Sequence, residues 1–186
     1  MKKAKFTFNQ KLGWGGLGFF LLLLVIWFKS QSIKIIDKSN HLMRSSTKQY
    51  ATRTLDVITQ IIVHHSASIG QIAEDYARYH VLSKGWAAIA YHFIIEKDGT
   101  IIQGNPLTNI SNHTAGQNTK SIGICLSGNF NLEQPSPKQL KSLKKLIHHL
   151  RNQLPQALAV YGHKDHGSTS CPGTNLYQQL NQYQLA

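Results

Sequence analysis

The sequence predicts a mixed α/β domain, with a central mixed β-sheet flanked by helices, joined to an N-terminal transmembrane helix. Strand-like and helix-like segments alternate without strict repetition from residue 54 to residue 186, which favours one layered core around a mixed sheet. The chain has 186 residues, enough for one ordinary domain and an appendage. Hydrophobic residues make up 41% and charged residues 15% of it, which is typical neither of disordered chains nor of multi-span membrane proteins.

The expected strands are short apolar runs, rich in β-branched residues and bounded by turn residues. They cover residues 57–64, 91–96, 101–103, 121–126 and 159–161. Between the second and third of these runs lies Asp98-Gly99, a strong signal for a two-residue β-hairpin turn. We therefore expect the second and third strands to pair in antiparallel fashion.

Three helices are predicted from apolar residues that recur at helical spacing. The first covers residues 72–80, and Gly85 supplies a stop signal after it. The second has an N-cap serine, a proline at its first position and a glutamine at its third, over Ser136-Pro137-Lys138-Gln139, followed by an apolar stripe to Leu150. The third begins at about Asn175.

The positive charge is concentrated in the N-terminal part of the chain. The formal charge is +12, and residues 1–53, with ten Lys and Arg against the single Asp37, carry +9 of it. Residues 54–186 keep only +3. The sequence thus gives no basis for a nucleic-acid partner of the folded part.

The N-terminal part predicts a membrane anchor. Residues 1–11 are basic and are expected in the cytoplasm, while residues 12–28 form an uncharged apolar run just long enough to cross a bilayer. A cleaved signal peptide is the alternative, but no small-x-small cleavage pattern follows the run. Residues 29–53 predict a polar stalk, and residues 54–186 the folded domain. We expect a single-pass protein of the cell membrane, with its domain on the periplasmic or extracellular side.

Three residues suggest a zinc (Zn²⁺) site. His64 ends a predicted strand, His163 follows another, and Cys171 comes eight residues later in a Gly/Ser/Pro loop. Two imidazoles and a thiolate suit zinc, and three protein ligands leave a fourth position open, as in catalytic sites. Spacing alone leaves His65 and His166 open as competing ligands. It also leaves open a disulfide between Cys171 and the other cysteine of the chain, Cys125.

Six sequence blocks in order resemble those of a known family. They are Ile62-Val63-His64-His65-Ser66-Ala67-Ser68; Gly85-Trp86 with Ala90-Tyr91-His92-Phe93-Ile94-Ile95 and Asp98-Gly99-Thr100; His113-Thr114-Ala115-Gly116; Ser121-Ile122-Gly123-Ile124-Cys125-Leu126; Gly162-His163-Lys164-Asp165; and Cys171-Pro172-Gly173. Across residues 58–178 the chain resembles the zinc-dependent N-acetylmuramoyl-L-alanine amidases, which include amidase-type phage lysozymes and peptidoglycan-recognition proteins. The resemblance implies the fold of the peptidoglycan-recognition proteins.

The resemblance also implies a reaction, hydrolysis of the amide between N-acetylmuramic acid and L-alanine in peptidoglycan. By position, His64, His163 and Cys171 match the family's zinc ligands. Relatives that only bind the cell wall usually have serine at the place of Cys171. Tyr91 matches a tyrosine beside the metal, where a phenol can hydrogen-bond the nucleophile or the developing oxyanion.

Two further residues are implied near the substrate. His113 matches a histidine on the substrate side of the site, where it could donate to the tetrahedral intermediate. Thr169 stands where some relatives have a lysine, and it brings a hydroxyl donor without a charge. Without that lysine, Tyr91, His113 or Lys164 would have to contribute more to charge stabilisation.

The expected protein is therefore a membrane-tethered, monomeric zinc amidase whose partner is peptidoglycan. A non-catalytic peptidoglycan-binding receptor on the same fold is one alternative. A phage-encoded endolysin is the other, in which four glycines at positions 13, 15, 16 and 18 weaken the anchor and allow release from the membrane.

Overall fold

The computed structural model describes residues 33–184. The predicted cytoplasmic segment, residues 1–11, and the predicted membrane span, residues 12–28, lie outside the described residues. Within residues 33–184, no helix has the length and apolar character needed to cross a membrane.

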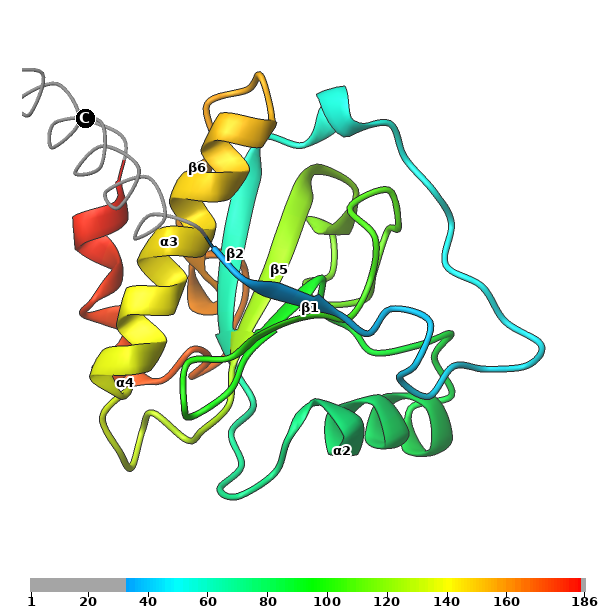
Figure 1. Ribbon diagram of the computed structural model, residues 1–186, viewed down its shortest axis with the longest axis horizontal. Helices are drawn as coiled ribbons and strands as arrows, with labels where there is room; N and C mark the ends of the chain where they lie inside the picture. Colours follow the sequence, from blue (N-terminus) through cyan, green and yellow to red (C-terminus); the bar gives the residue numbers. More distant parts are fainter. Residues whose placement is uncertain (1–32, 185–186) are drawn as a thin grey trace, which may run out of the picture. The chain divides into compact units, whose positions relative to one another are not determined.

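The described residues form one six-stranded mixed sheet (Figure 1). Its strands are β1 (Ile35–Asp37), β2 (Gln60–His65), β3 (Phe93–Ile95), β4 (Ile101–Gln103), β5 (Ser121–Leu126) and β6 (Ala159–Gly162), in the order β1-β4-β3-β5-β2-β6. Neighbouring strands are parallel except β3 and β4, which form the predicted antiparallel pair. The predicted mixed α/β fold is confirmed, and the carboxyl ends of β2, β3, β5 and β6 share one edge of the sheet.

Helices cover both faces of this sheet. They are α2 (Ala73–Arg78), which continues into a π-helical turn, η2 (Tyr79–Ser83), α3 (Pro137–Gln153) and the short α4 (Thr174–Tyr177). Short 3-10 turns complete the described part: η1 (Leu55–Val57), η3 (Asn118–Lys120), η4 (His163–His166) and η5 (Leu180–Tyr183).

Strand alternation decides which face receives the functional side chains. In β2 and β5 every second residue packs in the core that α3 covers, namely Ile61, Val63, Ile122, Ile124 and Leu126. Successive side chains of a strand point to opposite faces, so His64, Gly123 and Cys125 lie on the other face. There a smaller core contains Ala73, Tyr76 and Ala77 of α2. The polar and small residues of the central strands therefore gather on the face that α2 covers.

The prediction for α3 is confirmed at its N-terminus. The Ser136 hydroxyl accepts a hydrogen bond from the backbone N–H of Gln139 at 3.1 Å, and the Ser136 N–H donates to the Gln139 side chain at 3.1 Å. This capping box satisfies two donors that the first turn of a helix leaves free. The buried stripe Leu143, Leu146, Ile147 and Leu150 then faces the sheet.

Several predicted elements differ in their bounds. The strand predicted over residues 57–64 is β2, Gln60–His65, and the strand predicted over residues 91–96 is β3, Phe93–Ile95, which begins after Tyr91. The hairpin loop has three residues, Lys97 to Gly99, because the N–H of Gly99 donates to the Glu96 carbonyl and the Gly99 φ of 87° turns the chain back. The last helix ends at Tyr177, and the chain continues in η5, whose Leu180 is buried in the α3 core.

The predicted polar stalk is wrong for its described part. β1 pairs with β4, and Leu42 is buried in the core under α2. The buried Arg53 guanidinium donates to the backbone carbonyls of Leu107, at 2.9 Å, and Ser121, at 2.8 Å. The segment from residue 33 to residue 53 is therefore part of the domain. Its few apolar residues and the buried Arg53 make the contacts that hold it against the rest of the fold.

Candidate metal centre and its surroundings

Parallel pairing of β2 and β6 brings the first two candidate ligands together. Val63 and Gly162 are register partners in this pair, and His64 and His163 are the residues that follow them. Cys171 enters from the loop between η4 and α4. The possible ligand atoms of His64, His163 and Cys171 all lie within 4.8 Å of one another. The structure thus assembles the three residues that the sequence suggested.

The geometry and chemistry of this set fit a zinc ion. The Cys171 Sγ lies 3.6 Å from Nδ1 of His64, and the ring centroids of His64 and His163 are 4.7 Å apart. The three side chains line one cavity of about 330 Å³, which leaves room for a further ligand on the open side. Two imidazoles, one thiol and an open position are the donor set of catalytic zinc sites.

The alternative ligands are placed elsewhere. His65 points to the opposite face, where its Nδ1 accepts a hydrogen bond from the Phe130 N–H at 3.2 Å. The His166 ring packs edge-on against Tyr161, with centroids 4.9 Å apart. Neither belongs to the cluster that could hold a metal, and both Cys125 and Cys171 are free thiols.

Burial keeps the candidate ligands in uncharged forms. It lowers the pKa of His64 well below its usual range, with His113 and His163 adding to the effect. Burial also lowers the pKa of His163, so both imidazoles have lone pairs available to a cation near neutral pH. Burial raises the pKa of Cys171 to about 12. Binding of a cation would therefore release the thiol proton, as metal–thiolate formation requires.

Tyr91 lies beside the ligand set, where the resemblance implies it. Its ring centroid is 5.3 Å from that of His64, and its side chain lines the same cavity. Burial raises the pKa of Tyr91 well above its usual value, and the Cys125 and Cys171 thiols add to the shift. The phenol therefore keeps its proton and can act as a hydrogen-bond donor.

His113 and Thr169, the other residues implied near the substrate, also line this cavity. His113 is buried, with 5% of the residue exposed, and its Nδ1 lies 3.1 Å from Nε2 of the candidate ligand His64. Thr169 is exposed on the rim of the cavity, where its hydroxyl accepts from the Cys171 N–H at 3.2 Å. Lys164 does not line the cavity, since its Nζ lies over the Tyr177 ring, 4.7 Å from the centroid.

Other residues that line this cavity had no role predicted from the sequence, among them His80, Trp86 and Asn112. The rings of His80 and Trp86 stack with centroids 5.1 Å apart, and the His80 ring meets Tyr91 edge-on at 5.6 Å. In the sequence, His80 is only the last residue of a predicted helix, and Trp86 is only one residue of the second block of the resemblance. With Tyr91 they contribute a cluster of aromatic rings to the lining of the cavity.

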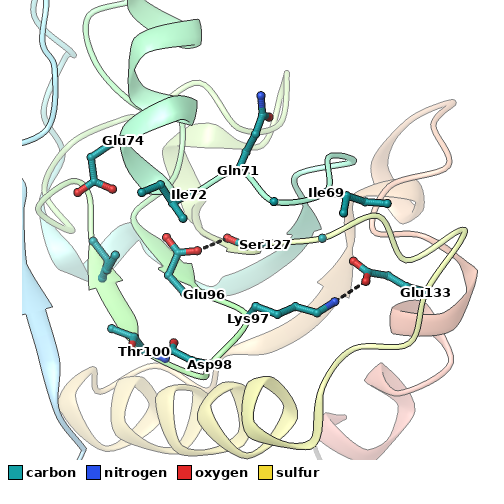
Figure 2. A pocket seen from close by; sticks show the side chains of 13 residues that line it. Ile69, Gln71, Ile72, Glu74, Glu96, Lys97, Asp98, Thr100, Ser127 and Glu133 are labelled. Atoms are coloured by element: carbon teal, nitrogen blue, oxygen red, sulfur yellow. Dashed lines mark hydrogen bonds and ion pairs between the residues drawn. The ribbon is translucent and has the colours of Figure 1, made fainter.

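A larger cavity of about 530 Å³ lies between the N-terminus of α2, the β3–β4 hairpin and the loop after β5 (Figure 2). The Glu96 carboxylate accepts from the Ala73 N–H at 2.8 Å and from the Ser127 hydroxyl at 2.6 Å, and Lys97 pairs with Glu133. Burial raises the pKa of Glu96. None of the candidate ligands or candidate catalytic residues lines this cavity, so the larger of the two cavities is not the candidate metal centre.

Comparison with known proteins identifies the family. The family described as N-acetylmuramoyl-L-alanine amidase matches residues 53–174. The chain belongs to this amidase family. The family membership inferred from the six sequence blocks is thereby confirmed.

Individual relatives in this amidase family carry two kinds of name. Peptidoglycan-recognition protein SC2 of Drosophila melanogaster is 33% identical over 174 residues, covering 86% of this chain and 93% of that protein. The structure of N-acetylmuramoyl-L-alanine amidase LysC from Clostridium intestinale URNW has a TM-score of 0.67 and 30% identity, covering 82% of this chain and 98% of that one. Peptidoglycan recognition protein-LE in complex with tracheal cytotoxin, a monomeric diaminopimelic acid-type peptidoglycan, has a TM-score of 0.70 and 25% identity over 80% of this chain and 92% of that one. Family membership therefore includes both amidases and recognition proteins, and the chemistry of the site has to distinguish them.

Proposed function

We propose that this protein is a zinc-dependent hydrolase that cleaves the amide bond between N-acetylmuramic acid and L-alanine in peptidoglycan. The observation that carries the proposal is the convergence of His64, His163 and Cys171 beside Tyr91 in one cavity. The amidase name of one structural relative and the peptidoglycan fragment bound to another support it.

The side chains of this site have separate tasks in the proposed reaction. His64, His163 and Cys171 would hold the ion, with the Cys171 proton leaving as it binds. Zinc, when bound, lowers the pKa of a water molecule and polarises a carbonyl oxygen. Tyr91 keeps its proton, lines the same cavity and would donate to the oxygen that becomes negative as the amide carbon turns tetrahedral. The stacked rings of Trp86 and His80 would provide an aromatic surface for contact with a muramyl peptide.

A binding-only receptor is the alternative from another functional class. Such a protein needs a cavity of complementary shape but no thiol directed at two imidazoles. The 3.6 Å approach of the Cys171 Sγ to His64 therefore favours the enzyme. The receptor predicts that the protein binds peptidoglycan and releases nothing from it, even with zinc present.

The proposed location is the outer face of the cell membrane, with residues 12–28 as the anchor. An anchored enzyme would cut only the wall within reach of the membrane. Fractionation of cells over time distinguishes this from an endolysin, because a released enzyme would move from the membrane pool to the soluble pool. Cleavage of the N-terminal segment would show as a mass decrease in the mature protein.

The decisive experiment incubates the full-length protein with purified peptidoglycan, with equimolar zinc or after chelation. Mass spectrometry follows stem peptides that carry a free L-alanine amine. Zinc-dependent release that is lost in Cys171→Ser and in His163→Ala is the expected result. His166→Ala changes a histidine three residues away, outside the ligand set, and should retain release. Wall binding without any peptide release by the wild-type protein would instead support the receptor.

A further inference from the structure

The His64 imidazole uses its two nitrogens in opposite directions. Nδ1 lies 3.6 Å from the Cys171 Sγ, and Nε2 lies 3.1 Å from Nδ1 of His113. A neutral imidazole carries one N–H, so only one nitrogen can offer a lone pair to a cation. Which one does so depends on the direction of the hydrogen bond between His64 and His113.

That direction is determined at Ser121. Its hydroxyl oxygen lies 2.7 Å from the Gln117 carbonyl oxygen and 3.2 Å from Nε2 of His113. A carbonyl oxygen only accepts, so the 2.7 Å contact requires the Ser121 hydrogen to point at Gln117. The Ser121 oxygen must then accept from Nε2–H of His113. Nδ1 of His113 consequently has no hydrogen.

The remaining step of the chain defines the form of His64. Nδ1 of His113 accepts from Nε2–H of His64, which leaves the lone pair of His64 Nδ1 on the side of Cys171. The Thr114 hydroxyl, 3.1 Å from His113 Nδ1 and 3.3 Å from His64 Nε2, can donate to the first and accept from the second.

The side chains that form these hydrogen bonds are shielded from solvent. His64, His113, Thr114 and Ser121 are each 5% exposed or less. Buried polar groups of this kind must satisfy one another, so the polarity of each bond fixes the next.

We propose that His113 is a positioning residue for His64, and that the chain from Gln117 through Ser121 and His113 fixes the metal-binding tautomer of His64 before an ion arrives. The inference rests on the proposed metal site but not on hydrolysis. It reassigns His113 from the substrate side, where the resemblance implied it, to the support of a ligand. Hydrogen-bond partners of metal-ligating histidines typically change metal affinity by about 10–100-fold when they are lost.

Three variants of the full-length protein test this series of hydrogen bonds. His113→Leu removes the acceptor for Nε2–H of His64 and keeps an apolar side chain of similar size. His113→Asn restores an acceptor, because its side-chain oxygen can stand close to the place of Nδ1. Ser121→Ala removes only the group that sets the direction, so it keeps the test valid if the leucine variant does not fold.

The measurements are the tautomer of His64, from nitrogen NMR shifts of the metal-free protein, and the zinc dissociation constant, from competition with a chelator. We expect hydrogen on Nε2 of His64 in the wild type, an affinity about 10–100-fold weaker in His113→Leu and Ser121→Ala, and recovery to within a few-fold in His113→Asn. Hydrogen on Nδ1 in the wild type, or unchanged affinity in folded His113→Leu, would overturn the inference. A wild type with hydrogen on Nε2 that releases no stem peptide would support this inference and contradict the proposed function.

Discussion

Gly123 lies directly beneath the imidazole of His113. A Cβ at position 123 would stand 2.6 Å from Cγ of that ring and 2.9 Å from its Nδ1. Because Gly123 has no side chain, the His113 ring can lie against β5 at this position. The ring in turn contacts His64, so Gly123 affects the position of His64 through His113.

Gly123→Ala should consequently impair stability and metal binding together. The added methyl group forces the buried His113 ring to move, which costs roughly 1–3 kcal/mol in a packed interior. Zinc affinity should fall as well, because His64 loses its aligned partner. Thermal unfolding and chelator competition measure the two effects. Gly167→Ala is the matched control, since a Cβ there meets nothing within 4 Å, and both quantities should stay unchanged.

Tyr91→Phe should separate catalysis from metal binding. In the proposed reaction the Tyr91 phenol, which keeps its proton, would donate to the developing oxyanion, and removal of one such donor typically lowers kcat by about 10²–10³-fold. The zinc dissociation constant should stay close to the wild-type value, because the candidate ligands are His64, His163 and Cys171. Initial rates of peptide release give kcat. Tyr79→Phe, half-exposed on η2, is the control, and equal rates in wild type and Tyr91→Phe would contradict the assigned role.

His92 should make the domain less stable in mild acid. Burial, helped by the charge of Arg53, lowers the pKa of His92 from its usual 6.5 to about 3. Between these values the unfolded chain takes up a proton that the folded protein does not, so stability is lost as the pH falls below 6.5. One such histidine contributes up to about 1.4 kcal/mol per pH unit.

Urea unfolding between pH 7.5 and pH 5 tests this effect. His92→Asn removes the titrating group and retains an acceptor for the Gly123 N–H, which donates to His92 Nδ1 at 3.0 Å. Its stability should fall less steeply with pH than that of the wild type. His148→Asn, on the exposed side of α3, serves as the control and should keep the wild-type slope. Identical slopes in wild type and His92→Asn would rule out the assignment.

The residues that sequence analysis placed correctly are those whose environment is local. β5 runs from Ser121 to Leu126 as expected, because its apolar run is continuous and buried. The Ser136 cap and the start of α3 depend on four consecutive residues. His64 lies near the end of one recognisable strand and His163 directly follows another, so parallel pairing alone brings them together.

The errors concern residues whose environment is made by distant parts of the chain. β1 has only three residues and one partner strand, too little for any periodicity to show. Arg53 appears in the sequence as one more charge of a basic segment, yet its partners are carbonyls more than 50 residues away. The position of the His113 ring, whose role stays a prediction, likewise depends on the absence of a side chain at Gly123 and on Ser121, neither of which its own motif contains.

Truncation tests the corrected N-terminal boundary of the domain. A chain that begins at residue 54 lacks β1, Leu42 and Arg53, so it leaves β4 as an unpaired edge and uncovers part of the core under α2. It also leaves buried carbonyls, among them that of Ser121, without their guanidinium donor, and each such loss costs about 1–3 kcal/mol. A chain that begins at residue 33 keeps all these contacts. The shorter chain should therefore unfold at a markedly lower temperature or aggregate, and the single substitution Arg53→Met in the longer chain should reproduce part of the loss. Equal melting temperatures for the two chains would contradict this boundary and would support a stalk before residue 54.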